Sequence, residues 1–139
     1  MKLVVLDASL WVARLVPQDA FHEAVKTWMN AQRADGVQFV SPGLLLAEVA
    51  GAVSRRTGDR ELAQHVLETL SNLPNLRLVE MDRSLVLRAA DLAARLGLRG
   101  ADSFYVAIAS GLSLPLVTLD EDQRERAAAD VTVLALAEG

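Results

Sequence analysis

The chain has 139 residues and a mass of 15.0 kDa, enough for one domain with a buried core and too little for two ordinary domains. With 52% hydrophobic and 23% charged residues, it is predicted to be globular and not disordered. The absence of cysteine excludes disulfides, thiol catalysis and thiolate metal sites, and the net charge of −4 argues against a protein that coats nucleic acid nonspecifically.

We expect neither an export signal nor a membrane-spanning segment in this sequence. The apolar run at residues 3–6 is interrupted by Asp7, so it is shorter than the ~7–15 residues of a secretory signal. The longest charge-free stretch, 103–119, includes Gly111 and Pro115 and is shorter than the ~20 apolar residues of a membrane span. We therefore expect a cytoplasmic protein in which this stretch forms a buried helix, a turn and a strand.

Hydrophobic periodicity predicts strands that alternate with helices along the chain. In chain order, the patterns predict a strand at 2–6, helices at 8–16 and 19–36, a strand at 38–40, helices at 41–56 and 61–73, a strand at 76–79, helices at 82–97 and from 101, a strand at 116–119, a helix at 121–129 and a strand at 131–134. We expect Asp19, Ser41 and Asp82 to cap helices, with Gly97 near a helix end. Such alternation is typical of an α/β fold with an open, mainly parallel sheet of about five strands and helices on both faces.

Two aspartates, Asp7 and Asp120, each end a predicted strand. In open α/β sheets, ligands bind beyond the carboxyl ends of the strands, where the strand order reverses. Both residues are therefore candidates to face one crevice. The alternative for each is that it caps the following helix or starts a turn.

Glu48 lies in the apolar segment 44–50, which offers little polar surface on any side of the predicted helix. Burying a carboxylate without a partner is costly, so a metal ligand fits this position. The alternative is a narrow solvent-facing stripe that continues from Glu48 to Arg55.

Asp102 directly precedes an apolar helix and follows Gly100, which permits a close approach of the backbone. Taken alone, Asp102 is expected to be a helix N-cap. A carboxylate at a helix amino terminus can also reach a cation, and the company of the other acids favours that role.

Four motifs follow one another along the chain: Val-Leu-Asp7-Ala-Ser9, Glu48 in an apolar helix, Arg99-Gly-Ala-Asp102-Ser and Val-Thr118-Leu-Asp120. In this order they resemble the motifs of the PIN-domain nucleases. The likeness spans essentially the whole chain and implies one PIN domain over residues 1–139, with three α/β/α layers. Length and compact plan are most similar to VapC, the toxin half of VapBC toxin–antitoxin pairs. One small departure is Ser103, where the family often has alanine.

The resemblance implies a ribonuclease that hydrolyses RNA phosphodiester bonds and leaves 5′-phosphate and 3′-hydroxyl ends. It assigns Mg²⁺ or Mn²⁺ to four carboxylate ligands, Asp7, Glu48, Asp102 and Asp120, with Ser9 and Thr118 as supporting polar groups. Hard cations prefer oxygen ligands, and such an ion polarises the phosphoryl oxygen and activates a water. Asp122 is a further candidate ligand, although with Glu121 it is better explained as first-turn helix charge.

Close carboxylates repel one another without a metal, so at least one should have a raised pKa. We therefore expect Asp7→Asn or Asp120→Asn to abolish cleavage and to raise the melting temperature of the metal-free protein.

The partners implied by the resemblance are RNA, a VapB-like antitoxin and a second copy in a homodimer. Arg14, Arg99 and Arg124 are candidates to contact RNA, the alternative for each being a solvated surface arginine. Trp11 and Trp28 are expected to be core residues, and partner contact is the less favoured alternative for both. His22 and His65 are expected to lie on helix surfaces.

Other classes fit less well. A receiver-type phosphoacceptor needs paired acids after the first strand and a late lysine, yet no lysine follows Lys26. A haloacid-dehalogenase-like phosphatase needs Asp-x-Asp at that turn, and no Gly-Lys-Ser or Gly-Lys-Thr phosphate loop occurs. Two alternatives stay open: a housekeeping RNA-processing PIN nuclease, which an adjacent antitoxin gene would distinguish from a toxin, and a non-catalytic α/β signalling or binding module.

Overall fold

The computed structural model describes residues 2–136 as a five-stranded sheet between layers of helices. All strand pairs are parallel, in the order β3-β2-β1-β4-β5. The strands are β1 (Leu3–Leu6), β2 (Gln38–Pro42), β3 (Leu76–Val79), β4 (Leu116–Val117) and β5 (Val133–Leu134). The helices are α1 (Ala8–Leu15), α2 (His22–Ala34), α3 (Leu44–Thr57), α4 (Arg60–Ser71), α5 (Arg83–Leu96), α6 (Gly100–Leu112) and α7 (Glu121–Ala127). The predicted open, parallel α/β sheet is confirmed.

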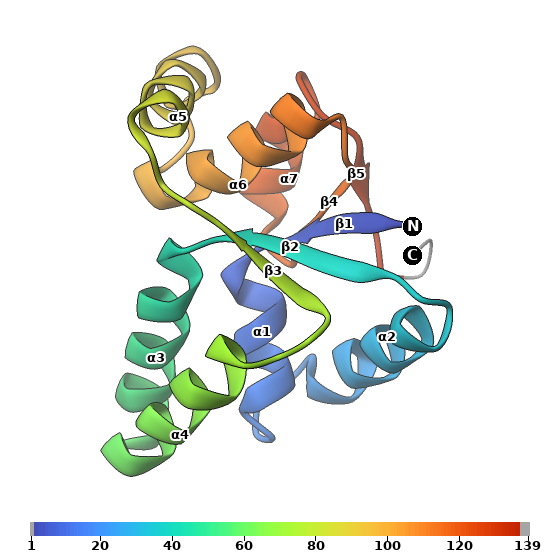
Figure 1. Ribbon diagram of the computed structural model, residues 1–139, viewed down its shortest axis with the longest axis vertical. Helices are drawn as coiled ribbons and strands as arrows, with labels where there is room; N and C mark the ends of the chain where they lie inside the picture. Colours follow the sequence, from blue (N-terminus) through green and yellow to red (C-terminus); the bar gives the residue numbers. More distant parts are fainter. Residues whose placement is uncertain (1, 137–139) are drawn as a thin grey trace.

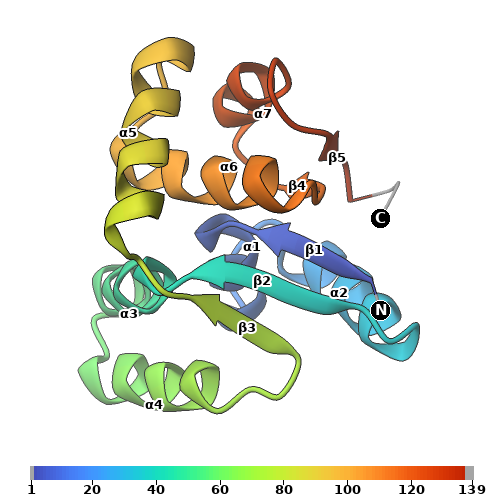
Figure 2. The same cartoon turned by 45° about the horizontal axis from the view of Figure 1, so that its top comes forward.

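The helices cover both faces of the sheet. Helices α1 to α4 lie on one face and α5 to α7 on the other, which gives the predicted three α/β/α layers (Figure 1). The arrowheads of β1, β2 and β3 point to the same side of the molecule (Figure 2). Residues that directly follow these strands are therefore gathered at one edge of the sheet.

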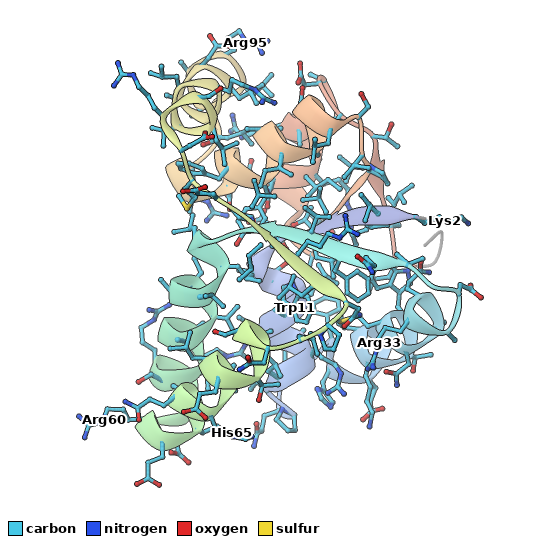
Figure 3. All side chains as sticks on the ribbon, viewed as in Figure 1. Lys2, Trp11, Arg33, Arg60, His65 and Arg95 are labelled. Carbon is cyan, nitrogen blue, oxygen red and sulfur yellow. The ribbon has the colours of Figure 1, made fainter. Side chains whose placement is uncertain are left out.

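The core lies between the sheet and both helical layers, which explains why β1 is a continuous apolar run with no polar alternation. Trp11 and Trp28 are 2% and 7% exposed and pack on the Phe39 ring, with ring centroids 5.8 and 6.0 Å apart. Figure 3 shows Trp11 inside the layer formed by α1 to α4. The preferred interpretation of both tryptophans as core residues is confirmed.

The charge-free stretch 103–119 forms most of α6, a turn and β4, as predicted. Ser113 ends α6 in the left-handed conformation with φ 54°. Within residues 2–136, no helix combines the length and the apolar character needed to cross a membrane.

Of the predicted helix caps Asp19, Ser41 and Asp82, only Asp82 is confirmed. Ser41 and Pro42 belong to β2, where they pair with β3, and the Ser41 hydroxyl donates to the Leu6 carbonyl over 2.6 Å. Pairing with β3 therefore outweighs the local signal for a helix start, and α3 begins only at Leu44. By contrast, Asp82 caps α5 as expected.

Asp19 also does not cap α2, because that helix starts at His22 with Phe21 as the capping residue. The Asp19 carboxylate instead accepts from the Phe21 backbone N–H over 2.8 Å and from Arg56 over 2.7 Å. The loop before α2 is thus fastened to the end of α3.

Candidate active site

Asp7 and Asp120 follow the two central strands at the point where the strand order reverses. β1 lies between β2 and β4, so β2 and β3 extend the sheet to one side and β4 and β5 to the other. The register pairs Leu6 with Val117, which places Asp7 beside Thr118 and two residues from Asp120. This is the position at which open α/β sheets bind ligands.

Asp7 is a buried carboxylate, 4% exposed, with both oxygens engaged. Its Oδ1 accepts from the Ser9 backbone N–H at 3.1 Å and the Ser9 hydroxyl at 2.5 Å, and its Oδ2 accepts from the Thr118 hydroxyl at 2.5 Å. Burial raises the pKa of Asp7 to about 6, against these hydrogen bonds and with help from the charge of Asp102. Asp7 also caps α1, which is the alternative considered for it.

Glu48 lies half-buried on α3 and accepts a hydrogen bond from Tyr105 on α6. The Tyr105 hydroxyl lies 2.6 Å from Glu48 Oε1, and Tyr105 is only 1% exposed. Burial raises the pKa of Glu48 while this hydrogen bond opposes the shift. The pKa of Tyr105 is also raised, first by burial and then by Glu48, so the phenol stays protonated and donates.

Arg99 joins Asp102 to Asp120. Its Nε donates to Asp102 Oδ2 over 2.9 Å, and its Nη2 donates to Asp120 Oδ2. Asp120 caps α7 by accepting from the Gln123 N–H at 3.1 Å, and this bond, followed by Arg99, lowers the pKa of Asp120. The interpretation of Asp102 as an N-cap is wrong, because α6 begins at Gly100 with Arg99 in the capping position.

The four carboxylates share one neighbourhood and one kind of donor atom. The charge of Asp102 raises the pKa of both Asp7 and Glu48, and Asp102 shares Arg99 with Asp120. In the described part of the chain, no three acidic or histidine side chains are gathered into a ready-made metal cage. Instead, Asp102 and Asp120 are paired with Arg99, and Glu48 accepts from Tyr105. An all-oxygen set suits Mg²⁺ or Mn²⁺.

A cleft of about 610 Å³ opens beside this cluster. Its lining residues are Ala8, Ser9, Val12, Asp19, Phe21, Glu48, Ala52, Arg55, Arg56, Leu119 and Asp120. Glu48 and Asp120 lie among them together with two arginines, Arg55 and Arg56, that the sequence analysis did not select. The stripe from Glu48 to Arg55, considered only as a solvent-facing alternative, therefore lines a concave surface.

The structure separates the three arginines proposed to contact RNA. Arg99 lies at the acidic cluster and is 70% exposed. Arg14 lines a different depression, formed by α1, α2 and α4. Arg124 is half-buried and donates to the Thr118 carbonyl over 3.0 Å, so it supports the loop that carries Asp120 and is not a solvated surface residue.

Asp122 and the histidines lie outside the cleft. Both Asp122 oxygens accept from Arg126 at 3.0 Å, which favours its interpretation as helix surface charge. His22 is half-buried, with its Nδ1 at 2.8 Å from the Ala13 carbonyl oxygen, so its expected surface position is wrong. His65 is exposed on the outer side of α4, as expected (Figure 3).

Two supporting residues were missed by the sequence analysis. Tyr105 is the only tyrosine of the chain and lies three residues after Asp102, hence on the same side of the helix. Gln123 is 1% exposed, and its Oε1 lies 3.1 Å from the Thr118 hydroxyl. A polar residue three positions along a helix from a candidate acid is the signal that would have identified both.

Tyr105→Phe is expected to raise the pKa of Glu48 further, because it removes the donor that stabilises the carboxylate. Loss of a buried hydrogen bond should also lower the free energy of unfolding by about 1 kcal/mol. Carbon-13 NMR titration of the Glu48 carboxyl in the metal-free protein measures the first effect. Ser110→Ala, farther along α6, is the control, and an unchanged Glu48 titration in Tyr105→Phe would contradict the assigned contact.

Solved structures of other proteins share this fold. The toxin VapC20 of Mycobacterium tuberculosis, described as cleaving the sarcin-ricin loop, has 18% identity and a TM-score of 0.76, over 88% of this chain and 93% of that one. VapBC2 of Rickettsia felis, bound to a promoter DNA fragment, has 15% identity and a TM-score of 0.72, over 96% and 98%. FitAcB of Neisseria gonorrhoeae has 23% identity and a TM-score of 0.70, over 98% and 99%. At these identities the likeness shows a shared fold.

The family assignment comes from the sequence itself. None of the curated proteins matches this chain. The family model of the PIN domain matches residues 4–129, which is most of the sequence and includes the four carboxylates at positions 7, 48, 102 and 120. The chain therefore belongs to the PIN domain family.

Proposed function

We propose that this PIN domain is a divalent-metal-dependent endoribonuclease with Asp7, Glu48, Asp102 and Asp120 as the Mg²⁺ or Mn²⁺ ligands. The observation that carries the proposal is the convergence of these acids from separate elements on the carboxyl edge of β1 and β4. Family membership supports the same chemistry.

Within this mechanism the ion, when bound, supplies polarisation of the scissile phosphate and activation of a water. The residues of the chain prepare the site. Ser9 and Thr118 fix both oxygens of Asp7, and Tyr105 orients Glu48. The raised pKa values of both acids indicate that their charge is poorly solvated, so each gains by meeting a cation. Hydrolysis would leave 5′-phosphate and 3′-hydroxyl ends.

We also propose that the nuclease is the toxin of a type II toxin–antitoxin pair, with a VapB-like antitoxin as its partner, and that it forms a homodimer. Support comes from the solved relatives, which include a toxin–antitoxin complex of Klebsiella pneumoniae and DNA-bound VapBC of Salmonella typhimurium. RNA cleavage by such a toxin would arrest translation and growth.

Controlled expression in a bacterium tests this proposal, with growth and RNA integrity compared between the parent and Asp7→Asn. We expect the parent to arrest growth and fragment RNA, and Asp7→Asn to do neither. Equal arrest by both proteins would contradict the nuclease. Growth unaffected by the parent, together with RNA cleavage by the purified protein, would instead favour a housekeeping enzyme.

Metal removal is a second test of the proposed function. Purified protein treated with EDTA is expected to lose RNA cleavage completely and to recover it with added Mn²⁺ or Mg²⁺, because the carboxylates cannot replace the cation. Gel analysis of labelled cellular RNA measures the effect, and cleavage that persists in EDTA would contradict metal dependence.

A further inference from the structure

The 610 Å³ cleft has aromatic and basic lining residues besides its carboxylates. Phe21 lines it with 51% of its surface exposed, and Arg55 and Arg56 line it as well. The small apolar residues Val12 and Ala52 lie along the cleft as well. The cleft therefore combines carboxylates, an apolar surface and guanidinium groups.

Helix α3 sets the spacing between the acid and the base. Glu48, Ala52 and Arg55 are four and seven residues apart, so they share one face of α3, and all three line the cleft. Seven residues of helix correspond to a rise of about 10 Å. An extended ligand that lies along this face of α3 from Glu48 therefore reaches Arg55 within two helical turns.

Phe21 is held in place although its ring faces solvent. Its backbone N–H donates to Asp19 over 2.8 Å, and Asp19 in turn accepts from Arg56 over 2.7 Å. Burial opposes the charge of Asp19, but the Arg56 hydrogen bond prevails and lowers the pKa of that carboxyl. The adjacent His22 is tied to the Ala13 carbonyl. The Phe21 ring is therefore presented to solvent at the cleft from a loop that is fastened to α3.

Arg55 has a guanidinium available for a ligand. Among residues 2–136 it has no ion-pair or hydrogen-bond partner, whereas Arg56 is paired with Asp19. A Cβ at position 51 would lie 3.1 Å from Arg55 Nη1, so the glycine there leaves room for the guanidinium against the helix. An unpaired arginine at this place suits a phosphate oxygen.

We propose that Phe21 and Arg55 position the RNA beside the cleaved bond, with an unstacked base on the Phe21 ring and a backbone phosphate on Arg55. This rests on the proposed nuclease function and assigns two positioning residues to it. A base reaches an aromatic ring only when it is splayed out of a helix, so duplex RNA should be excluded. A peptide segment is the competing occupant. RNA is favoured because Glu48 and Asp120, the proposed ligands of the catalytic ion, line the same cleft.

Fluorescence anisotropy with a short, mixed-sequence, fluorescein-labelled RNA tests the proposal in buffer with EDTA, so that binding is read without cleavage. Phe21→Ala and Arg55→Ala should each weaken single-strand binding by about tenfold. Arg55→Ala should also reduce the slope of log affinity against log salt by about 0.7, and Arg55→Lys should restore that slope. Phe21→Trp should retain affinity because it keeps the stacking surface.

Matched controls come from α5, on the opposite face of the sheet. Leu87→Ala removes a side chain that is 55% exposed, and Arg83→Ala removes an exposed arginine, so neither should change RNA affinity. The same RNA annealed to its complement should bind more weakly than the single strand and should not respond to Phe21→Ala.

Three results would overturn the proposal. They are no measurable RNA binding by the parent, unchanged affinity in both Phe21→Ala and Arg55→Ala, or a loss of duplex affinity in these variants equal to their loss of single-strand affinity. If these variants keep RNA affinity but escape inhibition by a co-expressed antitoxin, the cleft is a protein-docking surface instead. The proposed nuclease is judged separately by Mn²⁺-dependent cleavage. If the nuclease proposal is wrong, cleavage is absent but the measured RNA affinities still stand. If the cleft proposal is wrong, the two variants bind RNA like the parent and cleavage is unaffected.

Discussion

Asparagine at position 7 is expected to abolish RNA cleavage and to raise the melting temperature of the metal-free protein at pH 7.5. Burial raises the pKa of Asp7 from 3.8 to about 6, so ionisation at neutral pH opposes folding. That difference corresponds to about 3 kcal/mol. Asparagine avoids this cost, and its amide can donate to Thr118, whose hydroxyl lies 3.1 Å from Gln123 Oε1.

The pH dependence has a definite sign. Because the folded pKa exceeds the unfolded one, the contribution of Asp7 to stability is fully present below about pH 4 and is lost as the pH rises through 6. Thermal denaturation in EDTA at pH 4 and 7.5 should therefore show a gap between Asp7→Asn and the parent that widens with pH. A lower melting temperature for Asp7→Asn at pH 7.5 would contradict this electrostatic account.

Asp120→Asn is the matched control, and here the structure differs from the sequence-based expectation that both substitutions stabilise. The Gln123 N–H and Arg99 lower the pKa of Asp120, so its charge favours the folded state. Asparagine still caps a helix well but loses the Arg99 ion pair. Asp120→Asn should therefore abolish cleavage without raising the melting temperature.

Arg99→Ala is expected to increase the affinity for Mn²⁺ by about two- to thirtyfold, because two exposed ion pairs worth about 0.2–1 kcal/mol each no longer compete with the metal. Arg99 spans Asp102 and Asp120 with a single guanidinium, in a position where a cation would satisfy the same oxygens. Without Arg99, the two carboxylates face each other unpaired, so the metal-free protein should melt at a lower temperature.

Isothermal titration calorimetry with Mn²⁺ measures this effect, and differential scanning calorimetry in EDTA measures the stability. Arg99→Lys keeps the charge but lacks the planar fork that bridges two carboxylates, so its affinity should fall between those of the parent and Arg99→Ala. Arg126→Ala removes an exposed arginine that, within residues 2–136, is paired with Asp122 and the Leu96 carbonyl, and should leave Mn²⁺ affinity unchanged. An Arg99→Ala protein with the Mn²⁺ affinity of the parent would show that Arg99 does not compete with the metal.

Most of the fold follows from local patterns in the sequence. β1 is recognisable because a strand covered on both faces must be apolar throughout, and its carboxyl end must meet that of a parallel neighbour. The order of the strands in the sheet is harder to predict from the sequence, since it depends on how the helices pack. The errors at Ser41 and Asp19 share one cause: a distant partner, β3 or Arg56, outweighs the local capping signal.

The acids of the candidate site could be selected from sequence, but their interactions could not. Position after a strand identifies Asp7 and Asp120, whereas the bridging role of Arg99 depends on the distance between α6 and α7. The cleft could not be predicted from the sequence either, because Phe21 and Arg55 belong to different parts of the chain and meet only after folding. Local spacing relates residues on one helix, and contacts between helices require the packed structure.

The most direct measurement is the anomalous diffraction of crystals of this protein grown with Mn²⁺. A manganese peak between positions 7, 48, 102 and 120, bound by carboxylate oxygens of Asp7 and at least two of the other acids and with Arg99 displaced, is the predicted result. Manganese bound only elsewhere on the protein, with the Arg99 ion pairs to Asp102 and Asp120 intact, would contradict a shared cation site.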